Sequence, residues 1–332
     1  MTNFKKIGLT ALAASLVSVS ANAGALTASG SASMNTEGHS GSSLNKGTTF
    51  SMANSVVLAG SGELDNGLTV SVSFELDQSD VNGTNSSFDS HSVTVSSDSM
   101  GTLTLAGHGG SSATSAIDTT VAGDMWDNFD GLANGASITF AAGAKGHGVD
   151  NNALFYKSPD LMDGLNITAS YNPQGANAAS EAGYGFNYTG VEGLSLSYAT
   201  TDIEAATTAA SGDNTVMKAS YAYGPVTISY SDMEAEVAGA ANALDGNSTS
   251  YAVSYTVSDE ISVTYGSETH DQGNKTVDME VEGISVAYTA GGMTITGKMQ
   301  SLDNGDFATG TTNDADYWAL PRYISGPNAT GY

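Results

Sequence analysis

The sequence predicts an all-β fold: a 16-stranded antiparallel transmembrane β-barrel with short periplasmic turns and long extracellular loops. Three observations lead to this prediction. Apolar and polar residues alternate with the period of a β-strand, tight turns alternate with long polar segments, and tyrosines recur at fixed positions relative to the turns.

The alternation is clearest between Leu68 and Asp77, where Leu, Val and Phe alternate with Thr, Ser and Glu. Successive side chains of a strand point to opposite faces, so one face of this strand is apolar and the other is polar. The same pattern returns in the segments 165–171, 194–198, 226–230, 261–265 and 284–288. A β-sandwich alternates too, with its apolar face inside, whereas a membrane barrel turns that face to lipid. Alternation alone therefore leaves both architectures open.

The connections between these segments differ in length in a regular way. Tight turns fall at 65–67, 97–101, 163–164, 190–193, 224–225, 258–260 and 290–292. Their Gly and Asn residues suit hairpins because they tolerate positive φ. Longer polar segments lie between them, at roughly 36–48, 78–88, 109–150, 173–182, 202–213, 233–247, 270–276 and 302–314. Seven turns and eight loops connect sixteen strands, and an even number is typical of a closed single-chain membrane barrel.

Tyrosines recur at both ends of the predicted hairpins. Tyr188 and Tyr255 each close a strand just before a tight turn, and Tyr198 and Tyr265 lie near the far end of the next strand. Repeated around a barrel, these positions predict two aromatic girdles at the membrane interfaces. The alternative is that tyrosine is simply a good strand former.

The N-terminus predicts export. Lys5 and Lys6 precede an apolar stretch over 7–19 and an Ala-Asn-Ala site at 21–23. We therefore expect residues 1–23 to be a secretory signal peptide and residues 24–332 to form the barrel. No later run is long and apolar enough for a transmembrane helix. The sequence contains no cysteine, so disulfides do not stabilise it. The expected location is the cell outer membrane.

The formal charge of the chain is −26. Two of its nine basic residues lie in the predicted signal peptide, which leaves seven basic and 35 acidic residues, a charge of −28, in the mature chain. This charge excludes nucleic acid as a partner, because phosphate binding requires a basic face. An acidic surface also keeps proteins soluble in high salt, so solvation is an alternative to a functional electric field.

Catalytic motifs are missing from the sequence. It has no Gly-x-Ser-x-Gly elbow, no His-Glu-x-x-His motif, no phosphate-binding glycine loop and no cysteine nucleophile, and its five histidines are scattered. We therefore expect neither enzymatic activity nor a resident cofactor. One weak alternative is a Ca²⁺ site formed by Asp124, Asp127 and Asp130, although their spacing does not match an EF-hand loop.

The chain resembles the general porin family of Gram-negative bacteria, particularly porins of marine alphaproteobacteria, over nearly the whole mature sequence. The motifs that carry the resemblance are Leu-Ala-Gly-Ser-Gly-Glu-Leu-Asp-Asn-Gly-Leu at 58–68, Met-Gly-Thr-Leu-Thr-Leu-Ala-Gly at 100–107 and Gly-Asp-Met-Trp-Asp-Asn-Phe-Asp at 123–130. The resemblance implies an outer-membrane channel for passive diffusion of small hydrophilic solutes. It also implies a homotrimer, contact with outer-membrane lipids and lipopolysaccharide, assembly by the barrel-insertion machinery, and a third long loop folded into the lumen.

That third loop, about 109–150, is the longest connection, and loops of this length in compact domains are usually functional. We expect Trp126 and Phe129 to pin it to the inner wall. We expect Asp124, Asp127 and Asp130 to face the aperture and form the pore constriction. The alternative is a mobile surface loop with solvated charges.

The predicted lumen offers few basic groups to oppose this acidic loop. The wall residues expected to face the lumen are Glu75, Asp77, His91, Lys157, Lys218 and Lys298. Carboxylates in a lumen with low-dielectric walls attract cations, so we expect a preference for cations. An alternative role for the lysines is structural pairing with neighbouring acids.

The C-terminus departs from the family pattern. Residues 316–320 begin an aromatic strand, but Pro321 follows, and proline cannot donate to a strand ladder. The tail 321–332 has no clean alternation, so closure between the first strand, 25–34, and the last is the part of the barrel prediction with least support. The functional alternative is an exported, acidic, β-rich surface-layer or adhesive structural protein.

Overall fold

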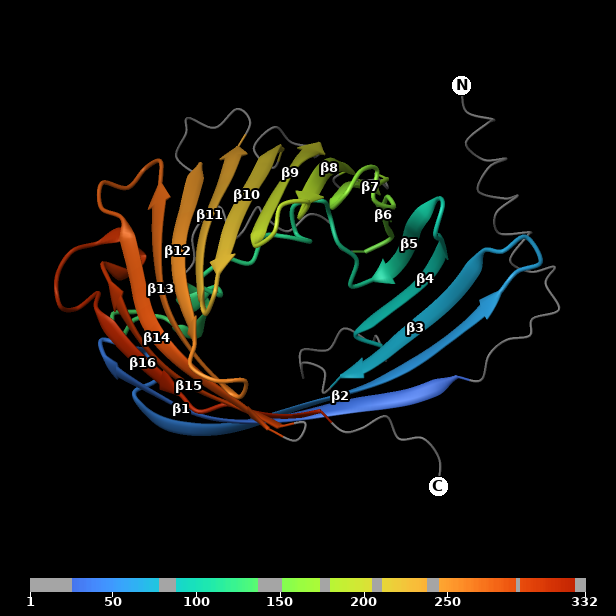
Figure 1. Ribbon diagram of the computed structural model, residues 1–332. Helices are drawn as coiled ribbons and strands as arrows, with labels where there is room; N and C mark the ends of the chain where they lie inside the picture. The colour runs from blue at the N-terminus through green and yellow to red at the C-terminus, as the bar shows by residue number, and fades with distance from the viewer. Residues whose placement is uncertain are drawn as a thin grey trace.

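The structure, a computed structural model, describes residues 26–77, 88–136, 151–173, 180–204, 211–237, 245–290 and 293–325. The chain forms one antiparallel sheet that curves into a ring (Figure 1). The predicted signal peptide lies outside the described residues, as do 137–150 of the third loop and 326–332 of the tail. Among the residues described, no helix is long and apolar enough to cross a bilayer.

The strands follow one another around the ring, each paired with its sequence neighbours. Their bounds are β1 (Thr27–Gly41), β2 (Gly47–Glu63), β3 (Thr69–Asp77), β4 (Ser90–Ser97), β5 (Gly101–His108), β6 (Ala153–Lys157), β7 (Leu165–Asn172), β8 (Ser180–Tyr188), β9 (Leu194–Glu204), β10 (Gly212–Tyr223), β11 (Val226–Val237), β12 (Gly246–Thr256), β13 (Ile261–Gln272), β14 (Met279–Ala290), β15 (Met293–Asp303), β16 (Ala315–Ala319) and β17 (Arg322–Ser325). Two short 3₁₀ helices, η1 (Met125–Asn128) and η3 (Gly305–Phe307), lie in connections.

The barrel is closed through Pro321. β16 and β17 each pair with β1 on one side and β15 on the other, so they are two halves of one closing strand. Across the break, the Leu320 amide donates to the Thr36 carbonyl at 2.8 Å, and the Thr296 amide donates to the Pro321 carbonyl at 3.1 Å. The predicted sixteen-stranded barrel is confirmed. The part of the prediction with least support was closure near Pro321, and the described residues 322–325 pair on both sides, because proline removes one donor and keeps its acceptor.

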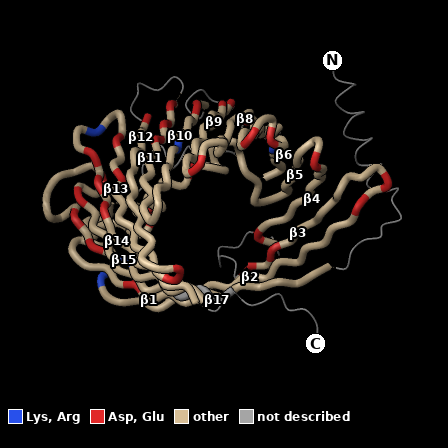
Figure 2. Tube along the Cα trace, in the orientation of Figure 1, with Lys and Arg blue, Asp and Glu red and all other residues tan. Residues whose placement is uncertain are grey.

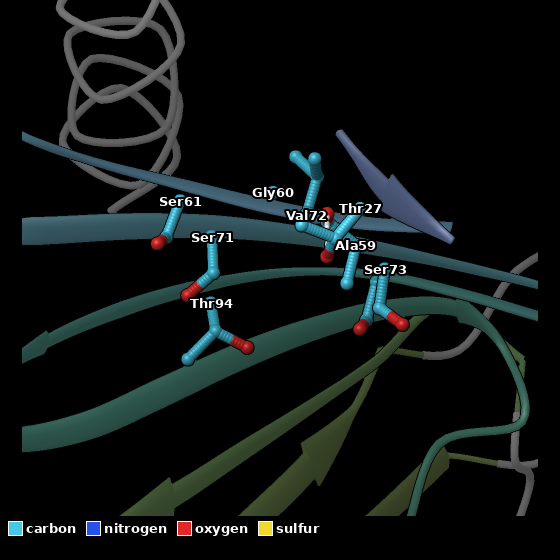
Figure 3. Close-up of a pocket in the computed structure, with 9 residues that line it drawn as sticks. Thr27, Ala59, Gly60, Ser61, Ser71, Val72, Ser73 and Thr94 are labelled. Carbon is cyan, nitrogen blue, oxygen red and sulfur yellow. Dashed lines mark hydrogen bonds between the residues drawn. The ribbon is translucent and has the colours of Figure 1, made fainter. Parts of the chain in front are cut away.

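In the half of the barrel that lies next to the tight turns, the apolar face of the sheet is the outer face. Val72 lies on one side of the sheet, and the hydroxyls of Ser71, Ser73 and Thr94 point to the other side, toward the enclosed space (Figure 3). These hydroxyls line a cavity of about 420 Å³ on β2–β4. Outward apolar side chains are correspondingly exposed, as for Ile228 at 59%. This is the inversion that distinguishes a membrane barrel from a sandwich.

Several strands run further toward the loops than predicted. β1 and β2 stay paired as far as His39 and Gly47, inside the predicted loop 36–48, and β11 continues into the predicted loop 233–247. The reason is a reversal of polarity within the strand. At the loop end of β11, Glu234 and Glu236 are exposed while Ala235 and Val237 are buried. A sequence pattern in which apolar residues are expected to face outward therefore predicts the end of the strand too early.

Candidate pore constriction

The described part of the third long connection, residues 109–136, lies against the inner face of the barrel (Figure 1). We call this segment the inner loop. It first contacts β7, where the Ala113 amide donates to Ser170 Oγ at 2.9 Å. It then crosses β9, where Thr114 Oγ1 and Thr201 Oγ1 lie 2.9 Å apart. The segment thus follows the wall from strand to strand instead of extending outward.

Small polar side chains on the wall receive the backbone of the inner loop. The Val121 amide donates to Ser250 Oγ of β12 at 3.0 Å and lies 3.2 Å from Ser231 Oγ of β11. Both serines are fully buried. Gly266 of β13 permits close approach, because a Cβ there would lie 2.9 Å from Ala122 Cβ. The inner face of the sheet therefore accepts hydrogen bonds from the loop backbone and allows the loop to approach closely.

Glu268 of β13 makes the densest set of contacts with the inner loop. Its side chain is completely buried, and its carboxylate accepts hydrogen bonds from Thr120 Oγ1, the Met125 amide at 2.9 Å and the Trp126 amide at 3.1 Å. These two amides open η1, and a carboxylate at such a position is favourable because the N–H groups there lack helical partners. His270 Nε2 lies 3.5 Å from the same carboxylate.

The two aromatic residues of the inner loop pack against the wall. Phe129 is 5% exposed and lies near the Tyr317 ring, with 6.1 Å between ring centroids. Trp126 meets the His270 ring edge-on at 6.1 Å. Phe129 belongs to an apolar cluster with Met125 and Leu132 of the loop. Its other members are Phe307 of η3 and the wall residues Ala235, Met279, Val281, Leu302, Ala315, Tyr317 and Ala319.

The three aspartates have different environments. Asp124 accepts a hydrogen bond from the Thr120 amide at 2.8 Å, and burial raises the pKa of its carboxyl group despite that bond. Asp130 accepts from Asn45 at 3.0 Å and lies 3.8 Å from His39 of β1. Asp127 is exposed. Asp130 is exposed as well, so the carboxylates of Asp127 and Asp130 are both open to solvent.

The possible Ca²⁺ site gains no support from this arrangement. Asp124 is occupied within the loop and Asp130 bonds toward the first connection, so their carboxylates do not converge. Within the described ranges, no group of three or more His, Cys, Asp or Glu residues is placed to hold a metal ion.

The far end of the inner loop is attached to the first connection, 42–46. The Leu44 amide donates to the Gly131 carbonyl at 2.9 Å, and the Ala133 amide donates to the Ser42 carbonyl at 2.7 Å. Ser43 and Leu132 form an isolated β-bridge, and Leu132 is fully buried. The loop is therefore held at both ends and in the middle.

The strand register also shows on which face of the sheet each of the six wall residues expected in the lumen lies. Glu75 and Asp77 share the inner face of β3 with Ser71 and Ser73. Lys157 pairs with Thr102 and Thr168 on that face.

Two further lysines lie on the inner face. Lys298 pairs with Ser285, two residues before the inward Gln300. Lys218 of β10 donates to the Thr119 carbonyl of the inner loop at 2.5 Å. This contact attaches Lys218 to the backbone of the inner loop, whereas the alternative considered for the lumen lysines was pairing with neighbouring acids.

His91 differs from its predicted position. It pairs with Phe74, and its row continues with Val93 and Val95, so it lies on the outer, apolar face. Its ring occupies the space over Gly107, where an added Cβ would lie 2.0 Å from Nε2. The sequence places His91 in the row of Val93 and Val95, and the parity of the strand outweighs the polarity of the imidazole.

Sequence reasoning missed the wall residues that hold the inner loop. Glu268, Ser231, Ser250 and Gly266 come from three strands that are distant from the loop in sequence. A signal was present for Glu268 and His270, which occupy successive inward positions of β13 where hydroxyl residues precede them. A carboxylate in an inward row of small polar residues indicates an internal partner, because buried charges require hydrogen bonds.

A family model for Gram-negative porins matches residues 8–320. In structure, the chain is similar to a loop L8 deletion mutant of OmpT, an outer membrane protein of Vibrio cholerae, with a TM-score of 0.65, 15% identity, and coverage of 90% of this chain and 99% of that one. It is also similar to a triple mutant of the Rh. blastica porin, with a TM-score of 0.62, 17% identity, and coverage of 91% and 100%. No curated relative matches by sequence. Likenesses at such identities show the fold, whereas the family match covers most of the chain. The chain therefore belongs to the Gram-negative porin family and is an outer-membrane channel protein.

Proposed function

We propose that this porin is a passive, cation-preferring channel for small hydrophilic solutes, narrowed by the inner loop. The observation that supports a narrowed channel is the attachment of the loop to the inner faces of β7, β9 and β11–β13. A segment held on one side of the barrel leaves the passage beside the opposite wall, β2–β4. Hydroxyl groups line that wall, and they hydrogen-bond equally well to water and to polar solutes. The proposal includes no catalytic step.

The cation preference rests on the charges near this passage. Glu75 and Asp77 lie on the inner face of β3, and Asp127 is exposed on the inner loop. Lys218 is bonded to the loop and has Asp118 and Asp124 as neighbouring charges, which offset its own. Fixed carboxylates within low-dielectric walls raise the local concentration of cations. The formal charge of −26 on the chain also favours cations over anions.

Reversal potentials in a KCl gradient across a planar bilayer test the selectivity. We expect wild type to prefer K⁺ and Asp127→Asn to reduce that preference measurably. The matched control is Asp163→Asn, which removes an exposed carboxylate at a tight turn and should leave the potential unchanged. Anion selectivity of wild type would overturn the proposal.

The constriction has its own test. Deletion of residues 124–130 removes η1 and the aromatic contacts of the inner loop, and we expect a larger single-channel conductance. A heat-dependent mobility shift on gels verifies that the deleted protein still forms a barrel. Unchanged conductance in a folded deletion variant would refute the constriction role.

We also propose that the protein assembles as a homotrimer through the outer faces of β1–β3. Members of this family form oligomers in the outer membrane. No outward position of β1, β2 or β3 carries a charge, and Phe50, Met52 and Val56 are exposed there. Exposed apolar faces of this kind are typical of obligate interfaces and of lipid contact. The remaining proposed partners are outer-membrane lipids, lipopolysaccharide and the barrel-insertion machinery, with no nucleic acid.

Mass measurement in detergent distinguishes self-association from lipid contact. We expect Met52→Asp to lower the particle mass from three chains to one. Ile228→Asp on β11 is the matched control, since it places the same charge on an outward face away from β1–β3. A single-chain mass for wild type would refute the trimer.

A further inference from the structure

The inner wall of β2–β4 contains a recess whose floor carries hydroxyl groups. We call it the hydroxyl recess, and its polar lining residues are Thr27, Ser61, Ser71, Ser73, Ser92 and Thr94. Its volume of about 420 Å³ lies within the range of roughly 300–1,000 Å³ that is usual for small-molecule sites. The inward positions of this part of the wall carry only Ala, Ser and Thr, so no long side chain fills the space above the sheet.

The strand register arranges the hydroxyls in rows. Ser61, Ser71 and Thr94 are direct partners across β2, β3 and β4, and Ser73 pairs with Ser92 in the next row. The labelled hydroxyls point to one side of the sheet (Figure 3). Neighbouring strands lie about 4.8 Å apart, and alternate residues lie about 6.8 Å apart along a strand. Hydroxyl groups therefore recur across the floor at spacings like those between the hydroxyls of one sugar ring.

Most hydroxyls of the recess have no protein partner. Those of Ser61, Ser71, Ser73 and Ser92 form no hydrogen bond to any residue that the structure describes. By contrast, inward hydroxyls of β7, β9, β11 and β12 hold the inner loop. A hydroxyl is both a donor and an acceptor, so it can bond to a hydroxyl of a solute in either sense. The hydroxyls that remain available thus lie on the side of the barrel that the described inner loop leaves uncovered.

Carboxylates border the hydroxyl recess along the strands. Glu75 occupies the next inward position after Ser73 on β3, and Glu63 occupies the next inward position after Ser61 on β2. Asp77 lies one inward position beyond Glu75. The five strands β1–β5 contain no lysine or arginine, and Figure 2 shows acidic but no basic residues along β2 and β3. The charge beside the recess is therefore negative.

Glu75 can accept a further hydrogen bond from a solute. Within the described residues, its carboxylate accepts one side-chain bond, from Ser90 Oγ at 3.1 Å. An ionised carboxylate offers about four lone-pair sites, so most of this capacity remains. The side chain is half-buried, and a partly buried charge is screened less by salt than an exposed one. Glu75 is thus suited to receive an ammonium group.

We propose that the hydroxyl recess is a weak binding site for hydroxylated organic cations of the amino-sugar class. The hydroxyls of the solute bond to the floor, and its ammonium group donates to Glu75. Charge-assisted hydrogen bonds are stronger than neutral ones, so the carboxylate distinguishes an amino sugar from a neutral sugar. The inference rests on the proposed passage beside β2–β4 and adds the class of solute that this passage retains.

Both features of the site are needed for this assignment. A neutral sugar would leave the negative charge of Glu75 without a counter-charge, and a cation without hydroxyls would leave the floor bonded only to water. None of the lining residues is aromatic, so no ring stacks on the sugar. The binding is therefore weak, as conduction requires, because a solute that binds tightly does not leave the channel.

Current noise in planar-bilayer recordings tests the site, because a solute that binds in the passage modulates the K⁺ current and the noise spectrum gives its residence time. The probe is glucosamine at a pH where its amine is protonated. Tetraethylammonium is the cation without hydroxyls, and glucose is the neutral sugar. We expect excess noise with glucosamine and none with the other two.

Variants assign the noise to the recess. Glu75→Gln should shorten the residence time of glucosamine roughly tenfold, the value of one hydrogen bond to a charged group. The double variant Ser71→Ala, Ser73→Ala should shorten it as well. Asp163→Asn at a tight turn and Ser285→Ala on the inner face of β14 are the matched controls and should leave it unchanged. A gel-mobility shift on heating verifies that each variant folds.

The outcomes separate this site from the channel itself. Wild type that prefers K⁺ but shows no glucosamine noise would overturn the site and leave the proposed function intact. Equal shortening by the recess variants and the controls would also overturn it. The reversal potential is measured before the sugar is added, and anion selectivity at that stage would contradict the proposed cation channel instead.

Discussion

Replacing Glu268 with alanine removes the acceptor that holds the middle of the inner loop. Three donors lose their partner: Thr120 Oγ1, the Met125 amide and the Trp126 amide. A buried donor left unpaired costs on the order of 1–3 kcal/mol. Since Trp126 is only partly buried and water can reach it, we take the low end for all three, about 3 kcal/mol in total.

A destabilisation of about 3 kcal/mol raises the ratio of detached to attached loop by roughly 150-fold. In planar-bilayer recordings, we therefore expect Glu268→Ala to show larger open-channel current fluctuations and a higher mean conductance than wild type. Glu268→Gln retains the oxygen that accepts from Thr120 and Met125, so its effect should be smaller.

The control for a lost carboxylate is Glu63→Ala. Glu63 lies on the inner face at the turn end of β2, pairs with Thr69 and is exposed, so its removal should not change the fluctuations. A gel-mobility shift on heating verifies that each variant folds. Wild-type conductance and noise in a folded Glu268→Ala variant would refute the reasoning that this carboxylate positions the inner loop.

Three further outcomes are expected. Gly266→Leu should raise conductance as Glu268→Ala does, because even a Cβ would lie 2.9 Å from Ala122 Cβ; Gly297→Leu, where nothing lies within 4 Å, should not. Burial raises the pKa of Asp124, so protonation favours the folded state and the ionised form costs stability as pH rises through that pKa. Asp124→Asn should therefore match or exceed wild type in heat resistance at neutral pH and lose any advantage in acid, and a less stable variant at neutral pH would contradict this. Removing divalent cations with a chelator in detergent should leave thermal unfolding unchanged, and a clear loss of stability would reinstate a calcium site.

Local pattern was sufficient for much of the fold. Period-2 rows such as Leu68 to Leu76, separated by short turns, indicate strands, their connection and their approximate number. The length of the third connection singled out the inner loop, and its Trp and Phe indicated a packed segment. These properties are encoded within a few residues of each other, which is why they can be read without coordinates.

The partners of that loop were decided by tertiary structure. Curvature of the closed sheet brings Glu268, Ser250 and Gly266 to the inner loop, and none of them is near it in sequence. Closure also determined that Pro321 is tolerated, since flanking amide and carbonyl groups keep both ladders continuous. Tertiary structure also explains why, toward the loop end of β11, the inward residues become apolar and the outward residues become charged. Once a loop packs inside the barrel and water covers its outside, the inward positions become apolar and the outward positions become charged.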